Sequence, residues 1–142
     1  MNQQTWKRLE DMFDEAPMMK AESVEESEFD ANAQSLGFEL PLDYKEFVCR
    51  FGGATVGAYS IYGLRASDTM GNDEASAFEV TERFKADGWV GLGESLVISS
   101  DHSGNPIYLK ASGEVWITDH DFGGVNKVAK SFEDYLLIKC LV

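Results

Sequence analysis

The sequence predicts an α+β fold, a single domain spanning residues 1–142 in which N-terminal helices and one C-terminal helix pack around an antiparallel sheet, a central meander. Three observations lead to this prediction. The first third of the chain has apolar residues at helical spacing, residues 96–119 alternate as strands do, and residues 131–142 return to helical spacing. With 142 residues, of which 44% are hydrophobic, the chain is long enough to bury one core.

Two helices are expected before residue 38. In residues 6–13 the apolar side chains recur at helical spacing, and Pro17 breaks the helix they predict. A second helix is expected to begin at Ser23, with Glu26 three residues later as the partner in a capping box, and to end at Gly37.

The segment FELPLDYKEFVCRFGG predicts a third helix. Pro41 suits its first turn, where a missing N–H costs nothing, and the pair Gly52-Gly53 stops it. Its buried stripe is expected to consist of Tyr44, Phe47, Val48 and Phe51.

The period of the apolar pattern then changes. Residues 55–64 are expected to form β-structure, and residues 74–86 a short polar helix that Gly88 ends. Beyond it, the segments SLVIS, PIYLKA and EVWITD are separated by DHSGN and SG, which are turn sequences. These three strands are predicted to form the meander.

The last segment, SFEDYLLIKCLV, is predicted to be a helix. Residues 119–124 (DHDFGG) are interpreted as the loop that leads from the last strand to this helix, and Ser131 is its expected N-cap. The side chains expected to face inward are Phe132, Tyr135, Leu136 and Ile138.

Negative charge is the outlying property of this composition. The chain has 25 Asp and Glu but only 12 Lys and Arg, so its formal net charge is −13 and its isoelectric point is about 4.4. Such a surface repels the phosphates of nucleic acids and of anionic lipids, and it accelerates association with basic partners. Nucleic acid and membranes are therefore not expected as partners. A negative charge that only keeps the protein dissolved is as ordinary an explanation as a basic partner.

The carboxylates are concentrated in two stretches. Nine lie between Glu10 and Asp30, where Lys20 is the one basic residue, and a smaller set precedes the polar helix. Charge runs are usually solvated helix faces, but this clustering slightly favours an acidic surface that binds a cationic protein. The residues expected to form it are Asp11, Asp14, Glu15, Glu22, Glu25, Glu26, Glu28, Asp68, Asp73 and Glu74.

The two cysteines and the N-terminal segment predict a cytoplasmic protein. Cys49 and Cys140 lie in apolar, helix-like stretches outside any CxxC motif, which is typical of buried free thiols in a reducing compartment. The segment MNQQTWKRLEDMF lacks the apolar run of a signal peptide, and no stretch approaches the length of a membrane span.

Both histidines lie in the segment VISSDHSGNPIYLKASGEVWITDHDFGG, as Asp101-His102 and Asp119-His120-Asp121. These are metal-ligand types, and a metal-dependent hydrolase is the interpretation they would support. Neighbouring residues of a strand point to opposite faces, however, so one strand does not present a compact His-Asp pair. Turn chemistry explains the same residues, because Asp, Asn and Gly favour turns. We therefore expect no metal and no cofactor.

No other motif argues for catalysis. The chain has no GxSxG elbow, and its glycine clusters lack the GxGxxG or Walker spacing. We expect no catalytic residues and no enzymatic activity.

Two long motifs together resemble the SUKH superfamily (the Smi1/Knr4-type domain), in its bacterial immunity-protein branch. LGFELPLDYKEFVCRFGGATVG resembles its signature of an "LP" before a helix that ends in a glycine pair, and LVISSDHSGNPIYLKASGEVWITDHD resembles its central strands. A terminal SFEDYL follows, so the resemblance covers roughly residues 23–141. The matching positions are Leu40, Pro41, Tyr44, Gly52, Gly53, Gly104, Gly113, Val115, Asp119 and His120.

The resemblance implies an α+β fold with helices around an antiparallel sheet, and no shared catalytic set. It also implies an immunity protein of a polymorphic or contact-dependent toxin system, which binds and neutralises a cognate toxin stoichiometrically, often a basic nuclease domain. Exposed aromatics would serve as anchors in such a complex, and Tyr59, Tyr62 and Trp89 are candidates. A regulatory or scaffolding module of the same fold is the main alternative. A homo-oligomer that pairs through an edge strand is possible but not predicted.

Overall fold

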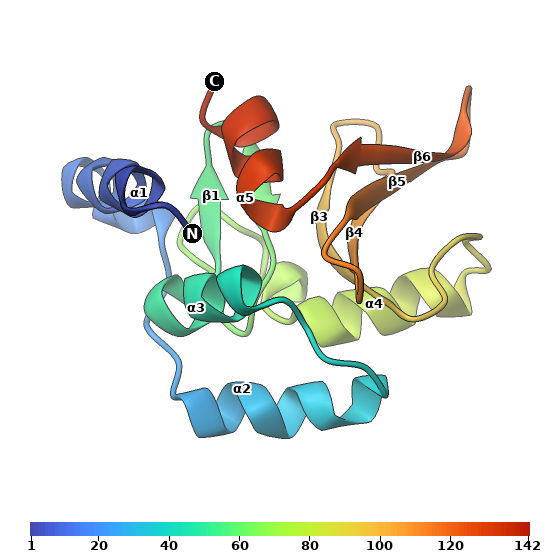
Figure 1. Ribbon diagram of the computed structural model, residues 1–142, viewed down its shortest axis with the longest axis horizontal. Helices are drawn as coiled ribbons and strands as arrows, with labels where there is room; N and C mark the ends of the chain where they lie inside the picture. Colours follow the sequence, from blue (N-terminus) through green and yellow to red (C-terminus); the bar gives the residue numbers. More distant parts are fainter.

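The structure, a computed structural model that describes residues 1–142, has the predicted α+β architecture (Figure 1). The helices are α1 (Gln3–Glu15), α2 (Glu26–Ala33), α3 (Leu42–Phe51), α4 (Ala77–Ala86) and α5 (Phe132–Tyr135), the last continued by a π-helical turn (Leu136–Cys140). The strands are β1 (Ala54–Val56), β2 (Tyr59–Ile61), β3 (Ser95–Ser100), β4 (Pro106–Lys110), β5 (Val115–Asp119) and β6 (Gly124–Ala129). Short 3₁₀ turns occupy Pro17–Met19, Gln34–Leu36 and Asn72–Glu74.

The sheet is an antiparallel meander with a hairpin placed against its first strand. Strands β3, β4, β5 and β6 are hydrogen-bonded in sequence order, and β1 pairs with β2 in a separate hairpin. That hairpin lies beside β3. The backbone N–H of Tyr62 donates to the carbonyl of Ile98 at 2.8 Å, and the hydroxyl of Ser99 donates to the backbone carbonyl of Ser60 at 2.7 Å. The predicted three-strand meander is confirmed, with one strand added.

Strand β6 corrects the expectation that residues 119–124 lead directly to the last helix. This segment instead turns the chain back, and β6 pairs antiparallel with β5 in a register that places Val125 opposite Thr118 and Asn126 opposite Ile117. Most of β6 is exposed, and its register shifts beside Val128. An exposed edge strand does not need the strict apolar alternation by which strands are recognised in a sequence.

The capping box expected at Ser23 does not form. Helix α2 begins at Glu26, and the side chain of its N-cap residue makes no capping hydrogen bond. The preceding segment is extended because its N–H groups bond elsewhere, that of Ala21 to Phe51 and Gly53, and that of Val24 to Cys49 at 2.9 Å. Residues 20–24 thus run along the end of α3 and along β1 instead of starting a helix.

One hydrophobic core lies between the helices and the sheet. The ring of Phe132 on α5 packs edge-on against Tyr44 and Phe47 of α3, with 5.3 Å between ring centroids in both pairs. Phe13 of α1 reaches the other end of α3 and lies 4.8 Å from Phe51. In Figure 1, α2 and α3 lie below the β1–β2 hairpin and α5 lies beside it.

Ser131 caps the last helix as predicted, but the expected inward position of Ile138 is wrong. The Ser131 hydroxyl accepts the N–H of Asp134, whereas the side chain of Ile138 is 49% exposed and that of Cys140 is buried. The π-helical turn adds a residue per turn and so changes which later side chains face the core. Burial raises the pKa of the Cys140 thiol to about 12, and both cysteines are free.

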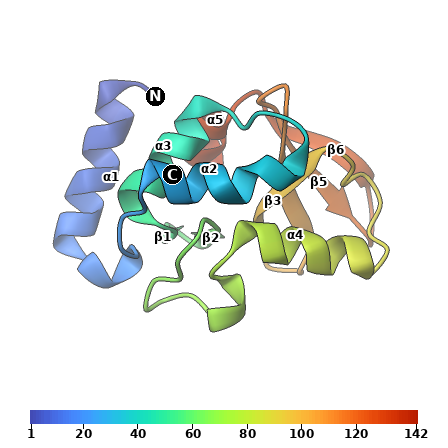
Figure 2. The same ribbon diagram turned by 90° about the horizontal axis from the view of Figure 1, so that it is seen from below.

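Helix α4 is joined to the sheet at an irregularity in β3. The register of β3 against β4 shifts between Val97 and Ser99, and the N–H of Val97 donates to the buried hydroxyl of Thr81 on α4 at 2.8 Å. Figures 1 and 2 show α4 running beneath the larger sheet. The loop from α4 to β3 lies beside the β5–β6 hairpin, because the Thr118 hydroxyl of β5 bonds to the carbonyl of Val90. No helix of the structure has both the length and the apolar character needed to cross a bilayer.

Candidate functional site

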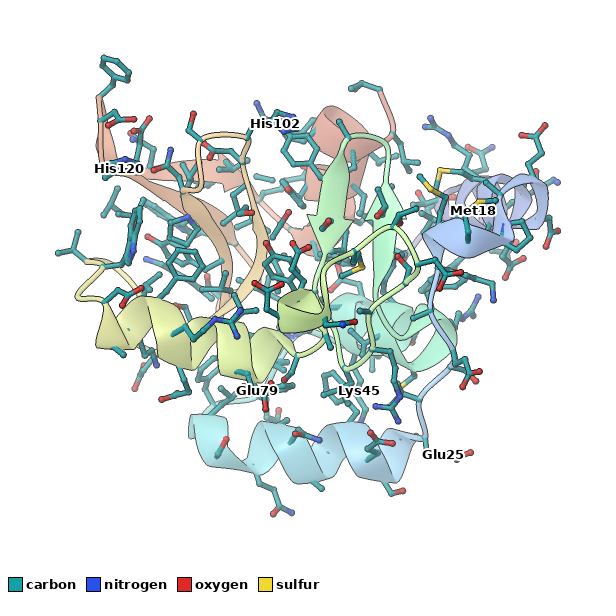
Figure 3. All side chains as sticks on the ribbon, turned by 180° about the vertical axis from the view of Figure 1, so that it is seen from behind. Met18, Glu25, Lys45, Glu79, His102 and His120 are labelled. Atoms are coloured by element: carbon teal, nitrogen blue, oxygen red, sulfur yellow. The ribbon has the colours of Figure 1, made fainter.

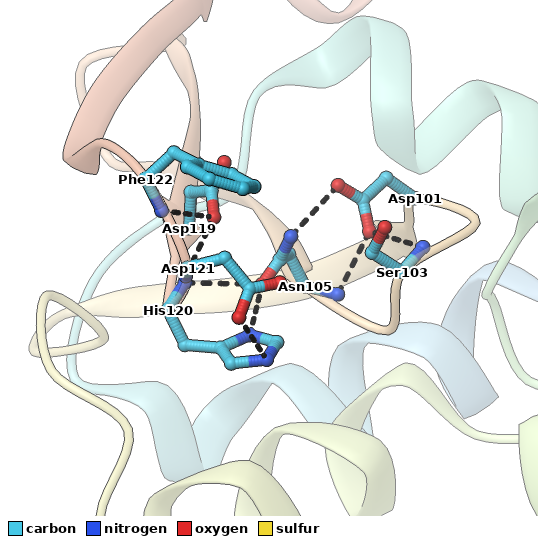
Figure 4. A network of polar contacts seen from close by, with 7 residues as sticks. All are labelled: Asp101, Ser103, Asn105, Asp119, His120, Asp121 and Phe122. Atoms are coloured by element: carbon cyan, nitrogen blue, oxygen red, sulfur yellow. Dashed lines mark hydrogen bonds and ion pairs between the residues drawn. The ribbon is translucent and has the colours of Figure 1, made fainter.

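The first Asp-His pair begins a tight turn after β3. The carboxylate of Asp101 accepts the backbone N–H groups of Ser103 at 3.0 Å and Asn105 at 2.8 Å, and the Asn105 side-chain amide at 2.9 Å (Figure 4). Burial acts to raise the pKa of Asp101, but these donated hydrogen bonds outweigh it and hold the pKa below its ordinary value. The role of Asp101 here is to accept the hydrogen bonds of its own turn, as its turn-former chemistry predicts.

Asn105 connects the two Asp-His segments, a role that the sequence did not reveal. Its side chain is buried, and its Oδ1 accepts the backbone N–H of His120 at 3.2 Å and lies 2.5 Å from His120 Nδ1. Because the amide nitrogen donates to Asp101, the amide oxygen faces His120, and Nδ1 of that ring carries a proton. The sequence marked Asn105 only as a turn former, since its second partner lies 15 residues further along the chain.

His120 contacts the carboxylate that follows it, which corrects the argument from strand alternation. His120 Nε2 lies 3.2 Å from Asp121 Oδ1. Strand β5 ends at Asp119, so His120 and Asp121 lie in a turn, where neighbouring side chains do not alternate between faces. The His120 ring also packs edge-on against Trp89, with 5.2 Å between centroids.

The two histidines lie on different parts of the molecule. His102 stacks on Tyr59 with 5.3 Å between centroids and an angle of 29° between the rings, whereas His120 packs on Trp89. Figure 3 shows both labelled side chains, with His120 beside the β5–β6 hairpin and His102 near β1–β2. No group of three or more His, Cys, Asp or Glu side chains has an arrangement that could hold a metal ion.

The β5–β6 turn, residues 119–124, is named the hairpin tip below. Asp119 Oδ1 accepts the N–H groups of Asp121 at 2.9 Å and Phe122 at 3.1 Å, which fixes the turn. The side chain of Phe122 is 94% exposed. The turn thus holds a large apolar side chain out in solvent, at a position where sequence reasoning placed only a loop.

A small hollow lies between the hairpin tip and the α4–β3 loop. Its volume is about 250 Å³, and its side-chain lining includes Asp87, Trp89, Asp119 and His120. The Thr118 hydroxyl bonds to the carbonyl of Val90 at 2.8 Å, so the loop is attached to the sheet that carries the tip.

The ten carboxylates expected to bind a partner lie on α1, on the segment 22–28, and on the connection between β2 and α4. Glu22 and Asp68 line one hollow of about 600 Å³ together with Lys20 and Arg65. Asp73 and Glu74 line another, of about 340 Å³, which also contains Tyr62 and Arg83. The acidic residues are therefore divided between separate hollows and helix faces. They do not form a single cluster.

Several of these carboxylates are already paired with cations of the same chain. Arg65 pairs with Glu28 at 2.7 Å, and Lys45 with Glu26 at 2.9 Å and with Asp30 at 2.7 Å. These hydrogen bonds lower the pKa of Glu28 and raise that of Lys45. Lys7 pairs with Asp11 and Arg50 with Glu10. The members of the N-terminal run that remain without a cationic partner are Asp14, Glu15, Glu22 and Glu25.

The motif residues around α3 shape the core and a close backbone contact. The buried hydroxyl of Tyr44 donates to the carbonyl of Tyr62 at 2.6 Å. Gly52 has φ +76°, and a Cβ at this position would lie 2.1 Å from the carbonyl oxygen of Glu22. Only glycine therefore allows the segment 20–24 to lie against the end of α3.

The other motif residues lie before α3, after it, or in the sheet. Leu40 is partly buried, and Pro41 is the N-cap of α3, one position before the first turn where it was expected. Gly53 follows α3, Val115 is buried in β5, and Gly104 and Gly113 lie in the turns that flank β4. Of the candidate aromatic anchors, Tyr62 is buried, while Tyr59 and Trp89 are partly buried.

The model of the SMI1/KNR4 family (SUKH-1) matches residues 23–138. The chain belongs to this family. All the motif residues, from Leu40 to His120, lie within the matched range of the SUKH-1 domain. Helix α1 lies outside it and packs on the SUKH-1 domain through Phe13 and through hydrogen bonds from Asn2 and Thr5 to Glu133. No curated protein sequence matches the chain.

Proposed function

We propose that this SUKH-1 protein is a bacterial immunity protein that binds a cognate toxin, a basic nuclease domain, in a stoichiometric complex and blocks it without catalysis. Membership of the family supports the class of function. The net charge of −13 supports the chemistry of the partner, because a protein that holds nucleic acid phosphates carries a cationic groove.

The observation that carries this proposal is the set of carboxylates left without internal partners. Asp14, Glu15, Glu22 and Glu25 are exposed, and none lies within ion-pair distance of a cation of this chain. Carboxylates that are not already paired are available to the lysines and arginines of a nuclease groove, where they would take the place of phosphates or dock beside the groove and block entry.

Steering by charge would make this complex form quickly. Opposite net charges raise association rates above those of neutral pairs, and salt screens the effect with a Debye length of about 8 Å at physiological ionic strength. The carboxylates contribute less to the lifetime of the complex, which depends on a few buried anchors.

The test is expression of the chain together with the toxin domain encoded beside its gene. We expect restored growth, a one-to-one complex in light scattering, and an association rate that falls as salt rises. An acidic protein of similar size and unrelated fold is the control for non-specific charge effects. Absence of protection and of a complex would contradict the proposal, and a location in a housekeeping operon would favour a regulatory module instead. Stoichiometric zinc or manganese in the purified protein would favour the hydrolase interpretation.

A further inference from the structure

We propose that the hairpin tip and the α4–β3 loop form a docking site that receives an arginine or lysine side chain of a protein partner, with the exposed Phe122 of the hairpin tip as a second, apolar contact. The site is made of Asp87, Trp89, Val90, Asp119, Phe122 and Val125, and is called the tip surface below. The chemistry of the site points to a cationic side chain. That this side chain belongs to the toxin domain rests on the proposed function.

The tip surface has three exposed apolar side chains. Phe122 is 94% exposed, Val90 65% and Val125 40%. Val125 lies next to the α4–β3 loop, since its Cγ2 would be 3.0 Å from a Cβ placed on Gly91. A large aromatic side chain exposed to solvent is typical of an interface anchor, because its burial removes a large apolar area from water.

The hollow between the hairpin tip and the α4–β3 loop has the chemistry of a cation site. Its lining includes the carboxylates of Asp87 and Asp119 and the ring of Trp89, and neither Lys nor Arg. The Oδ1 atom of Asp119 accepts the two N–H groups of the turn, whereas Oδ2 accepts no hydrogen bond from the protein. An indole ring and free carboxylate oxygens together favour a guanidinium or an ammonium group.

Hydrogen bonds within the chain hold the backbone of the tip surface in place. The Asp119 turn fixes Phe122, Asn105 holds His120, and Thr118 bonds to the α4–β3 loop. Little backbone entropy is then lost on binding, which favours affinity.

Charge complementarity selects the occupant. A nucleic acid or an anionic surface would bring phosphates against Asp87, Asp119 and Asp121, whereas a basic protein brings the matching charge. A volume of about 250 Å³ suits one side chain and not a folded element. The tip surface also lies at the opposite end of the molecule from α1 in Figure 1, so a partner held there need not compete for the carboxylates of α1.

The first experiment uses arginine itself as the probe. The ¹⁵N-labelled full chain is titrated with N-acetyl-arginine amide, and with N-acetyl-citrulline amide as the neutral control of the same shape. We expect the chemical-shift changes to be largest at the Trp89 indole N–H and at the amides of residues 88–91 and 119–125, and to be absent with citrulline.

Charge variants make this titration specific. The double variant Asp87→Asn with Asp119→Asn removes both carboxylates and keeps the Oδ1 acceptor of the turn, so we expect it to abolish the shifts. The matched control, Asp14→Asn with Glu15→Gln, makes the same change in net charge on α1 and should leave them. Shifts that are larger on α1 and α2 than at Trp89, or that appear equally with citrulline, would overturn the proposal.

The second experiment tests Phe122 in the complex with the toxin domain. We expect Phe122→Ser to raise the dissociation rate at least tenfold and to leave the association rate unchanged. Leu42→Ser, which alters a 66% exposed apolar residue at the start of α3, is the control and should change neither rate. Equal dissociation rates for Phe122→Ser and wild type would refute the anchor. If the wild type does not bind the toxin, the proposed function fails, and the arginine titration still decides the cation site.

Discussion

The acidic N-terminal region and the tip surface differ in how they hold their charges. The carboxylates of α1 and residues 22–28 are numerous and point into solvent, and several are neutralised by Lys7, Lys45, Arg50 and Arg65. The tip surface has few carboxylates, and one of them, Asp119, fixes the turn that carries the exposed Phe122. Diffuse charge accelerates encounter, whereas a fixed anchor lengthens the life of a complex. Under the two proposals, the two regions would therefore act at different steps of binding.

The largest effect on this comparison is expected from Asn105→Ala. This change leaves the Asp101 carboxylate and the ring of His120 without their shared, buried partner, so the free energy of unfolding should fall by about 2–3 kcal/mol. Urea unfolding measures it. Asn126→Ala removes an exposed amide that bonds to Gly123, and should cost about 0.5 kcal/mol or less. Equal losses in the two variants would mean that the tip is not held by Asn105.

The next effect tests the diffuse charge of the N-terminal region. Replacing Asp14, Glu15, Glu22 and Glu25 by their amides should lower the association rate with a basic partner about tenfold at low salt, because steering weakens, and leave the dissociation rate unchanged. Stopped-flow measurements at low salt and near 1 M salt would show the difference disappear, since the Debye length falls to about 3 Å.

A control with the same change in net charge separates location from total charge. The amide variants of Glu39, Glu79, Glu82 and Glu94 alter exposed carboxylates elsewhere on the surface. If they slow association as much as the first set does, then net charge alone directs the encounter and the N-terminal region has no special role.

A smaller effect concerns acid stability near the tip. The pKa of Asp101 is lower in the folded protein than in the unfolded chain, so its ionisation adds stability above the unfolded value of about 4 and loses it as the pH falls through the folded pKa. The Asp101→Asn variant lacks this contribution. We expect the stability difference between wild type and variant to be largest at neutral pH and to shrink below pH 4 in urea unfolding. A constant difference between pH 7 and pH 3 would contradict this assignment.

The smallest effect is expected from His102→Ala. Its ring is exposed and stacks on Tyr59, so the loss of stability should be about 0.5 kcal/mol and partner binding should not change. His120→Ala should cost more, about 1 kcal/mol, because a contact with the buried Asn105 is lost. Thermal unfolding compares the two. A larger loss of stability from His102→Ala than from His120→Ala would contradict the conclusion that only His120 contacts the buried Asn105.

Local patterns in the sequence predicted most of the fold. Helical spacing located α1 and α3, turn residues separated β3, β4 and β5, and the Ser131 cap is a local contact. Features that depend on distant residues were missed. The N–H of Val24 bonds to Cys49, so the helix expected at Ser23 starts later. The exposed strand β6 lacks a strong apolar alternation.

The candidate site depended even more on distant contacts. The charge run was visible in the sequence, but its neutralisation by Lys45 and Arg65 was not, because these residues lie far from Glu26 and Glu28 in the chain. The hydrogen bonds from Asp101 through Asn105 to His120 join the turn after β3 to the turn after β5. The exposure of Phe122 depends on the β5–β6 hairpin, which was not predicted. Turn chemistry indicated what Asp101 does, and the fold supplied its partners.

Strand β6 has a consequence for how copies of this protein behave together. The outer edge of β1 is covered, since Lys20 bridges to Ala54 and the N–H of Ala21 bonds to Gly53. The outer edge of β6 has no strand beside it, and such an edge is a template for pairing between chains. At neutral pH the net charge of −13 opposes the association of copies. Near pH 4.4, where the net charge vanishes, we expect copies to associate through this edge and the solution to become turbid. The acidic composition would therefore also limit self-association.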